Sequence, residues 1–150
     1  MARDLDIPIE IVACPTVREA DGLALSSRNG RLSPTERTKA PALPEALAIA
    51  SRRIASGAPV VATLDEARAT LTSAGFDPVE YLELRAADDF APLGVPGRPP
   101  RLLAAAWLGQ TRLIDNLEVI ANSEDDPELW RRRSESRAPT NGAEHENDPF

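Results

Sequence analysis

From residue 32 onward the hydrophobic pattern of the chain changes period once, about halfway along the chain, and this change decides the fold class. Apolar residues first recur at helical spacing, over 32–57 and 63–74. Residues 79–88 then alternate as a strand does, and 101–120 have the pattern of two strands joined at Gly109-Gln110. The order of two helical segments and three strands predicts an α+β module with a small three-stranded antiparallel sheet.

Capping signals place the first helical segment. Residues 33–36 read Ser-Pro-Thr-Glu, with serine at the N-cap, proline at the first helical position and glutamate three residues after the cap. Gly57 is a suitable stop. Pro41 and Pro44 interrupt the segment, which predicts a short first helix or a kink before Leu47.

The same capping pattern recurs at 63–66, Thr-Leu-Asp-Glu, and predicts a second helix that runs to Ala74 and stops at Gly75. In the strand that follows, either Tyr81 or Leu82 continues the inward face. Residues 91–100 combine glycines and prolines and are predicted to form a loop.

The segment IPIEIVACPTV, residues 7–17, is rich in β-branched residues and alternates only partly. This pattern predicts a strand that is covered on both faces. Such a strand needs neighbours, and the sequence before it contains no βαβ unit, so the first strand is expected to belong to a larger sheet. Cys14 within it is expected to be a small buried hydrophobe rather than a nucleophile.

The charge distribution argues against several classes of partner. The net charge is −7, and residues 1–121 carry 13 basic and 16 acidic side chains, against 4 and 8 in residues 122–150. No basic field suits nucleic acid, and no basic amphipathic run suits a membrane surface. Any anion site must therefore be local.

The cysteine content indicates the cellular setting of the chain, and the aromatic content limits which side chains can fill its core. With one cysteine the chain forms no internal disulfide, which favours a reducing, cytoplasmic setting. No apolar run approaches the roughly 20 residues of a membrane span. Aromatic residues make up only 4% of the chain, so Leu, Ala, Val and Ile must do most of the packing.

The C-terminal residues 122–150 are polar, interrupted by prolines and poor in aliphatic side chains, which predicts a disordered tail. His145, the only histidine, lies there without neighbours that resemble metal ligands or a catalytic dyad. Residues 130–137, WRRRSESR, suggest a nucleic-acid contact, but the acidic residues around them favour a mixed-charge tail.

The stretch GLALSSRNG, residues 22–30, is the main candidate site. Ser26 and Ser27 offer hydroxyl donors, and Arg28 offers a planar, permanently charged fork that suits phosphate oxygens. Two interpretations stay open on pattern alone: a turn before a helix, or an anion-binding loop.

Other polar residues carry similar alternatives. Arg18, Glu19 and Asp21 form either local ion pairs on a solvated loop or a group that orients Arg28 or a magnesium-bound phosphate. Trp107 is expected in the core or on a partly covered sheet face. The pair at 115–116, Asp-Asn, either binds a partner group or makes capping and turn hydrogen bonds.

Three stretches together resemble one enzyme family. PTVREADGLALSSRNGRLSPTER (15–37), VEYLELR (79–85) and LLAAAWLGQTRLIDN (103–117) are similar to pantothenate synthetase, also called pantoate–β-alanine ligase, over roughly residues 1–121. The resemblance implies a cytoplasmic, homodimeric enzyme with a Rossmann-type domain and a smaller domain that closes over ATP. It also implies ATP-dependent condensation of pantoate with β-alanine through pantoyl adenylate, with Mg²⁺ accompanying the ATP.

The resemblance assigns roles to five residues. It implies that Leu25 lies near adenine, that Ser26, Ser27 and Arg28 bind the ATP phosphates, and that the Val17 backbone contacts adenine. Preorganised donors of this kind stabilise charge that builds on the leaving pyrophosphate.

The sequence also departs from the family pattern. The histidine-containing phosphate motif, the pantoate-binding residues and the Gly-x-Lys-Asp segment are absent, and Lys39 lies in helical sequence. No catalytic or metal-binding residue is therefore assigned. The chain resembles a C-terminal portion: 1–31 a remnant of the nucleotide-binding domain, with 7–17 the last strand of its sheet, and 32–121 the C-terminal α+β domain.

Three origins of such a portion stay open: a truncated gene, a misplaced start codon, or one piece of a split enzyme. On any of them the chain is expected to be inactive without the missing N-terminal half. The alternative function is a non-catalytic α+β binding or interaction module derived from the ligase.

Overall fold

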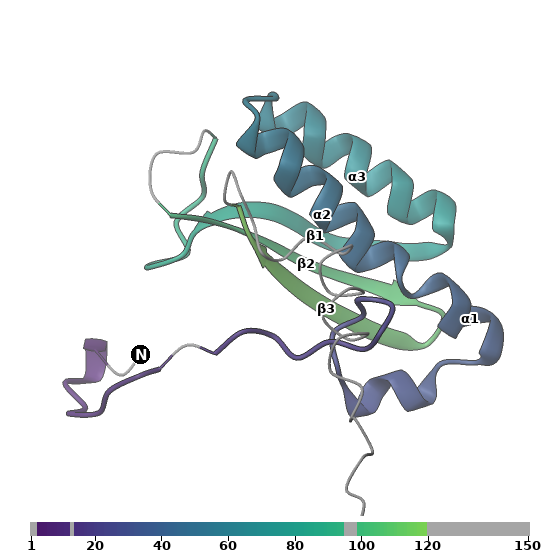
Figure 1. Ribbon diagram of the computed structural model, residues 1–150, viewed down its shortest axis with the longest axis horizontal. Coiled ribbons are helices and arrows are strands. Elements are labelled where there is room, and N and C mark those ends of the chain that lie inside the picture. Colours follow the sequence, from purple (N-terminus) through teal and green to yellow (C-terminus); the bar gives the residue numbers. More distant parts are fainter. Residues whose placement is uncertain (1–2, 13, 95–98, 120–150) are drawn as a thin grey trace, which may run out of the picture.

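The computed structural model describes residues 3–12, 14–94 and 99–119. Two long helices, α2 and α3, lie side by side over one face of a three-stranded sheet (Figure 1). The elements in chain order are the 3₁₀ turns η1 (Arg3–Leu5) and η2 (Ser27–Arg31), the helices α1 (Pro34–Lys39), α2 (Ala42–Ala55) and α3 (Val60–Ala74), and the strands β1 (Phe76–Ala86), β2 (Pro100–Leu108) and β3 (Thr111–Glu118). This order confirms the predicted α+β class.

The first capping box forms as predicted. The Ser33 hydroxyl accepts from the Glu36 N–H at 3.3 Å, and the Glu36 carboxylate accepts from the Ser33 N–H at 2.7 Å. The chain turns at Ala40-Pro41 and α2 begins immediately after it, so the predicted short first helix is correct. Pro44 is tolerated because it lies in the first turn of α2, where backbone N–H groups need no helical partner.

The second predicted capping box is wrong. Helix α3 begins at Val60, directly after Pro59, and the Thr63 N–H already donates to the Pro59 carbonyl at 3.0 Å. Thr63 therefore has helical backbone and cannot act as an N-cap, which requires extended backbone. The helix ends as predicted, with Gly75 in the left-handed conformation at φ 103°.

The sheet is an antiparallel meander in the order β1-β2-β3. Leu84 pairs with Leu102, and Ala104 pairs with Asp115. The β2–β3 connection at Gly109-Gln110 confirms the predicted hairpin. In β1 it is Leu82 that points into the core, and Tyr81 lies on the opposite face, which settles the alternative that the pattern left open.

Aliphatic side chains fill the space between the helices and the sheet, as the low aromatic content requires. Helix α3 packs on β1, and α2 packs on β3. Each buried leucine contributes roughly 1.5–3 kcal/mol of transfer free energy. The largest fully buried apolar side chains are Phe76, Leu43, Leu47, Ile54, Leu71, Leu82, Leu102 and Leu108.

The predicted strand over residues 7–17 is wrong for the described residues 7–12 and 14–17, which adopt no strand. This arm, defined as the described residues 3–12 and 14–16, extends away from the body of the molecule (Figure 1). Ile9, Ile11 and Val12 are 59%, 71% and 72% exposed. Strand residues must exchange backbone hydrogen bonds with a neighbouring strand, and the described part of the chain provides none beside the arm.

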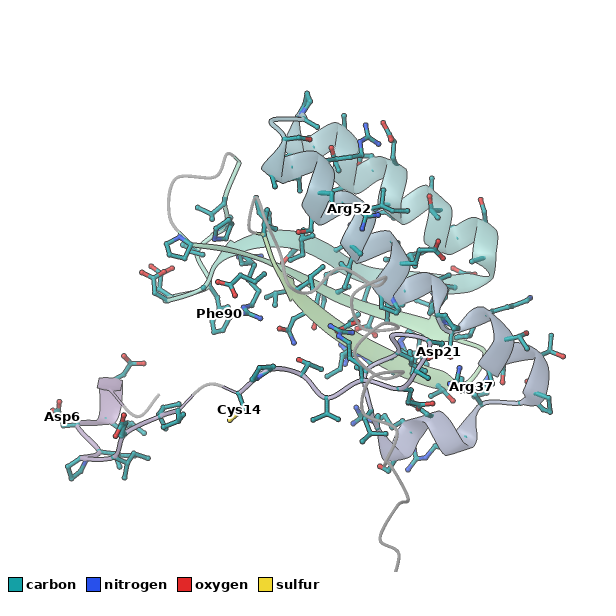
Figure 2. All side chains as sticks on the ribbon, viewed as in Figure 1. Asp6, Cys14, Asp21, Arg37, Arg52 and Phe90 are labelled. Carbon is teal, nitrogen blue, oxygen red and sulfur yellow. The ribbon has the colours of Figure 1, made fainter. Side chains whose placement is uncertain are left out.

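Cys14 corrects a second prediction because its side chain is exposed on the arm rather than buried (Figure 2). Burial of Cys14 was predicted from the strand at 7–17. Without that strand and its neighbours, nothing in the described part of the chain covers the side chain. The predictions for 122–150, including His145 and residues 130–137, lie outside the described residues.

Over the described residues, no helix is both long and apolar enough to span a bilayer. The same part of the chain brings together no group of three or more His, Cys, Asp or Glu side chains able to hold a metal ion.

Candidate functional site

A tight hairpin precedes the candidate loop. The Glu19 N–H donates to the Leu23 carbonyl at 2.8 Å, and the Leu25 N–H donates to the Val17 carbonyl at 2.9 Å. Gly22 occupies the turn with φ 86°, a conformation that suits glycine. Leu23 is only 2% exposed, so the hairpin, residues 17–25, is fixed to the core by its own turn.

The loop that follows is a structured turn. The Ser26 hydroxyl oxygen accepts from the Arg28 N–H at 3.2 Å and caps η2, while the Asn29 N–H donates to the Ser26 carbonyl at 3.0 Å. Ser26, Ser27 and Arg28 are all exposed. The turn interpretation is therefore correct as geometry, and it leaves three polar side chains facing solvent.

Arg28 differs in its surroundings from Arg18 and Arg37, the two paired arginines near the loop. Among the residues that the structure describes, its guanidinium has no hydrogen-bond or ion-pair partner, and only its backbone N–H is engaged. A guanidinium in this state keeps its full set of five N–H donors for a ligand.

The loop ion pairs contact Arg37 of α1 rather than Arg28. The Arg37 guanidinium donates to Asp21 at 2.5 Å and to Glu19 at 2.6 Å, and Figure 2 shows Arg37 beside Asp21. Partial burial opposes ionisation of Asp21, but hydrogen bonds from Arg37 and from the Leu23 N–H outweigh it, and its pKa lies below the usual value. Glu19 also accepts from the Asn29 amide at 2.6 Å, which links this cluster to the loop.

Arg18 is paired across the molecule with Asp115 of β3. Its two terminal nitrogens donate to the two carboxylate oxygens at 2.8 and 3.0 Å, and the two side chains are 9% and 1% exposed. Burial raises the pKa of Asp115, and the hydrogen bond from Arg18 opposes that rise. Neither interpretation of residues 115–116 includes this ion pair with Arg18; of the predicted local hydrogen bonds, the Asp115 carboxylate accepts one from the Asn116 N–H at 2.7 Å.

A surface pocket of about 350 Å³ lies between the loop and the sheet. Leu25, Ser26 and Arg28 line it from the loop side. The strands contribute Tyr81, Leu103, Arg112, Ile114, Asp115 and Asn116. Ser27 lies between Ser26 and Arg28, and the Val17 carbonyl accepts from the Leu25 N–H, but neither residue lines the pocket. Three of the five residues that the resemblance assigned to ATP are thus brought to one cavity.

Apart from the pair Asp115-Asn116, sequence reasoning missed the sheet side of the pocket. Tyr81, Leu103 and Ile114 lie on the face of the sheet opposite the helices, and the alternation of the strands was the available signal for them. Trp107 lies on the same face, half-buried, and its indole N–H donates to Glu80 at 2.6 Å, which fits the predicted partly covered position.

The sequence matches the model of one protein family, pantoate-beta-alanine ligase, over residues 1–118. Among curated proteins, the pantothenate synthetase of Chelativorans sp. (strain BNC1) is 61% identical over 119 residues, and that of Paracoccus denitrificans is 56% identical over 121 residues. Both alignments cover 79% of this chain and 42% of the relative. The chain thus spans less than half the length of the curated relatives that it matches.

Solved structures agree with the sequence matches. A crystal structure of pantothenate synthetase from Thermus thermophilus superposes with a TM-score of 0.72 at 41% identity, over 79% of this chain and 43% of that one. Pantoate-beta-alanine ligase from Francisella tularensis, complexed with beta-gamma ATP and beta-alanine, gives 0.52 at 28% identity, over 78% and 36%. On these matches, this chain belongs to the pantoate-beta-alanine ligase family.

Proposed function

We propose that this chain carries the phosphate-binding part of the ATP site of a pantoate–β-alanine ligase. The full reaction is the ATP-dependent condensation of pantoate with β-alanine through pantoyl adenylate, which gives pantothenate, AMP and pyrophosphate. The observation that carries the proposal is Arg28: an exposed guanidinium, without a partner among the described residues, beside Ser26 at the wall of a pocket.

The proposed roles follow from the hydrogen-bond donors and the exposed surface that each residue has available for a ligand. The Ser26 oxygen already accepts from the Arg28 N–H, so its hydroxyl proton is the part available to a phosphate oxygen. Ser27 adds a second exposed hydroxyl, and Arg28 binds two phosphate oxygens at once. Leu25, 64% exposed, offers apolar surface to adenine, and the Val17 backbone contacts it. Mg²⁺ accompanies the ATP in this proposal.

The catalytic assembly needs more than this chain. The chain spans 42% of its curated relatives, and no catalytic residue is assigned within it. We therefore include as partner a polypeptide that carries the remaining, N-terminal part of the longer relatives, with pantoate and β-alanine as substrates. A homodimeric, cytoplasmic enzyme, and the division into residues 1–31, 32–121 and 122–150, belong to the same proposal.

Titration with inorganic pyrophosphate in the presence of Mg²⁺, followed by calorimetry, tests the phosphate site directly. The wild-type chain is expected to bind, and Arg28→Ala to lose at least about tenfold in affinity, because charge-assisted hydrogen bonds to phosphate are the strong ones. Arg31→Ala is the matched control, since it removes an equal charge from another exposed residue of η2. An equal loss in both variants contradicts a specific role for Arg28.

Activity tests the rest of the proposal. The chain alone is expected to release no pantoate-dependent AMP. Adding the separately produced N-terminal part of the Chelativorans relative is expected to restore AMP release. In that mixture Arg28→Ala lowers the rate by about 10²–10³, the usual effect of removing one preorganised donor. Robust turnover by the chain alone contradicts the proposal, and no pyrophosphate binding favours the non-catalytic α+β module.

A further inference from the structure

We propose that Arg18 is a positioning residue for the loop Ser26–Arg28, which it holds in place by fastening the hairpin 17–25 to β3. This inference rests on the proposed function, because it concerns the same loop. Arg18 itself does not line the pocket, so it acts through the backbone rather than on a ligand.

The contacts of Arg18 join its own hairpin to strand β3. Besides the two bonds to the Asp115 carboxylate, its terminal nitrogens donate to the Gly22 carbonyl at 3.0 Å and to the Asn116 carbonyl at 3.1 Å. One guanidinium thus ties the turn of its own hairpin to two successive residues of β3. A lysine ammonium, with three donors on one atom, cannot reproduce this planar arrangement.

A short path leads from Arg18 to the loop. Arg18 forms a bridge with Ala24 across the hairpin, and the Leu25 N–H bonds to the Val17 carbonyl, one residue before Ser26. From the other side of the loop, the Asn29 amide donates to the Ala24 carbonyl at 3.0 Å. A shift of Arg18 therefore moves both ends of the segment that carries Ser26 and Arg28.

The location of the pair fits this role. Asp115 and Asn116, which accept hydrogen bonds from Arg18, line the same pocket as Ser26 and Arg28. The distance between the loop side and the strand side of that pocket is thus set by a buried, bidentate contact. Sites that bind a ligand through preorganised donors need those donors held to within about 0.5 Å of their binding positions.

Hydrogen exchange and pyrophosphate titration on the full chain test the proposal together. The variants are Arg18→Lys and the paired apolar replacement Arg18→Met with Asp115→Leu, which leaves no unpaired buried charge and so protects the fold. Both are expected to keep cooperative unfolding, to lose about tenfold of the protection of the Leu25 amide, and to bind pyrophosphate about tenfold more weakly.

Ile54→Val is the control, because it weakens the core of α2 far from the hairpin. It is expected to lower global stability and to keep wild-type Leu25 protection against local opening and wild-type pyrophosphate affinity. Folded Arg18 variants with wild-type protection and affinity overturn the inference while the proposed function stands. A wild-type chain that binds no pyrophosphate overturns the proposed function and this inference with it.

Discussion

At the scale of single residues, three arginines near the loop show how surroundings decide the use of one side chain. Arg18 is buried against a carboxylate, and Arg37 is about one-third exposed between two carboxylates. Arg28 is exposed and has no such partner among the described residues. Arg18 and Arg37 are therefore occupied by contacts inside the protein, whereas the Arg28 guanidinium faces solvent.

Asp115→Ala tests how much the buried Arg18–Asp115 pair contributes to the stability of the fold. The substitution leaves Arg18 charged and buried, so we expect a loss of about 3–5 kcal/mol in the free energy of unfolding, measured by urea denaturation. Glu66→Ala is the matched control, since its carboxylate pairs with Arg53 on the open surface, and no measurable change is expected there. Equal effects of the two variants contradict the distinction between buried and exposed pairs.

Gly109→Ala tests a close approach in the β2–β3 turn. Gly109 has φ 57°, and a Cβ there would overlap the Glu36 carboxylate that completes the capping box of α1. Gly57→Ala is the control, because φ is 91° there and no atom lies near the added Cβ. In thermal unfolding we expect about 1 kcal/mol of destabilisation at Gly57 and about 2 kcal/mol at Gly109. Equal losses at both positions refute the contact.

At the scale of elements, the sequence predicted what is decided locally. The order of helices and strands, the β2–β3 hairpin and the helix stop at Gly75 all follow from short patterns. The two capping boxes have nearly the same residues, yet only Ser33 has extended backbone and caps a helix. Thr63 fails because Pro59 already starts α3 one turn earlier, which a four-residue pattern does not reveal.

The capping box of α1 predicts a pH dependence. The Ser33 N–H, and then the Ser33 hydroxyl, stabilise the ionised Glu36 and hold its pKa below its ordinary value of 4.5. The unfolded chain therefore binds more protons in that range, so this contribution is present above about pH 4.5 and is lost as the pH falls through the lower, folded pKa. Glu36→Gln is expected to unfold in urea with a shallower dependence on pH between 6 and 3. Identical slopes would show that Glu36 titrates alike in both states.

At the scale of the whole molecule, the sequence predicted the loop side of the site and, on the strand side, only the pair Asp115-Asn116. The loop Ser26–Arg28 was identified from its residues and from the family resemblance. The Arg18–Asp115 pair joins positions 97 residues apart, and the strand side of the pocket depends on which face of the sheet is left uncovered. Both depend on how the elements pack, which a single sequence does not show. The strand predicted for the arm was wrong for the converse reason: strand propensity is a local property of the sequence, but a strand forms only beside a neighbouring strand.

The arm gives the last prediction. Its apolar side chains are exposed, and the described backbone hydrogen bond within it, from the Ile9 N–H to the Ile7 carbonyl, is local. Deleting residues 1–14 is therefore expected to change the free energy of unfolding by less than about 0.5 kcal/mol in urea. The same deletion is expected to abolish AMP release in the mixture with the N-terminal part of a relative, because we propose that residues 7–17 pair with the sheet of that part.

A point substitution separates pairing from simple contact. Ile11→Pro removes one N–H from the arm, and proline is excluded from central strands, so the reconstituted rate should fall while the stability of the chain alone stays unchanged. Ile11→Thr keeps the N–H and the strand propensity and should retain most of the rate. If proline and threonine behave alike, the arm associates through its side chains and not as a strand, and the predicted place of residues 7–17 in a larger sheet is wrong.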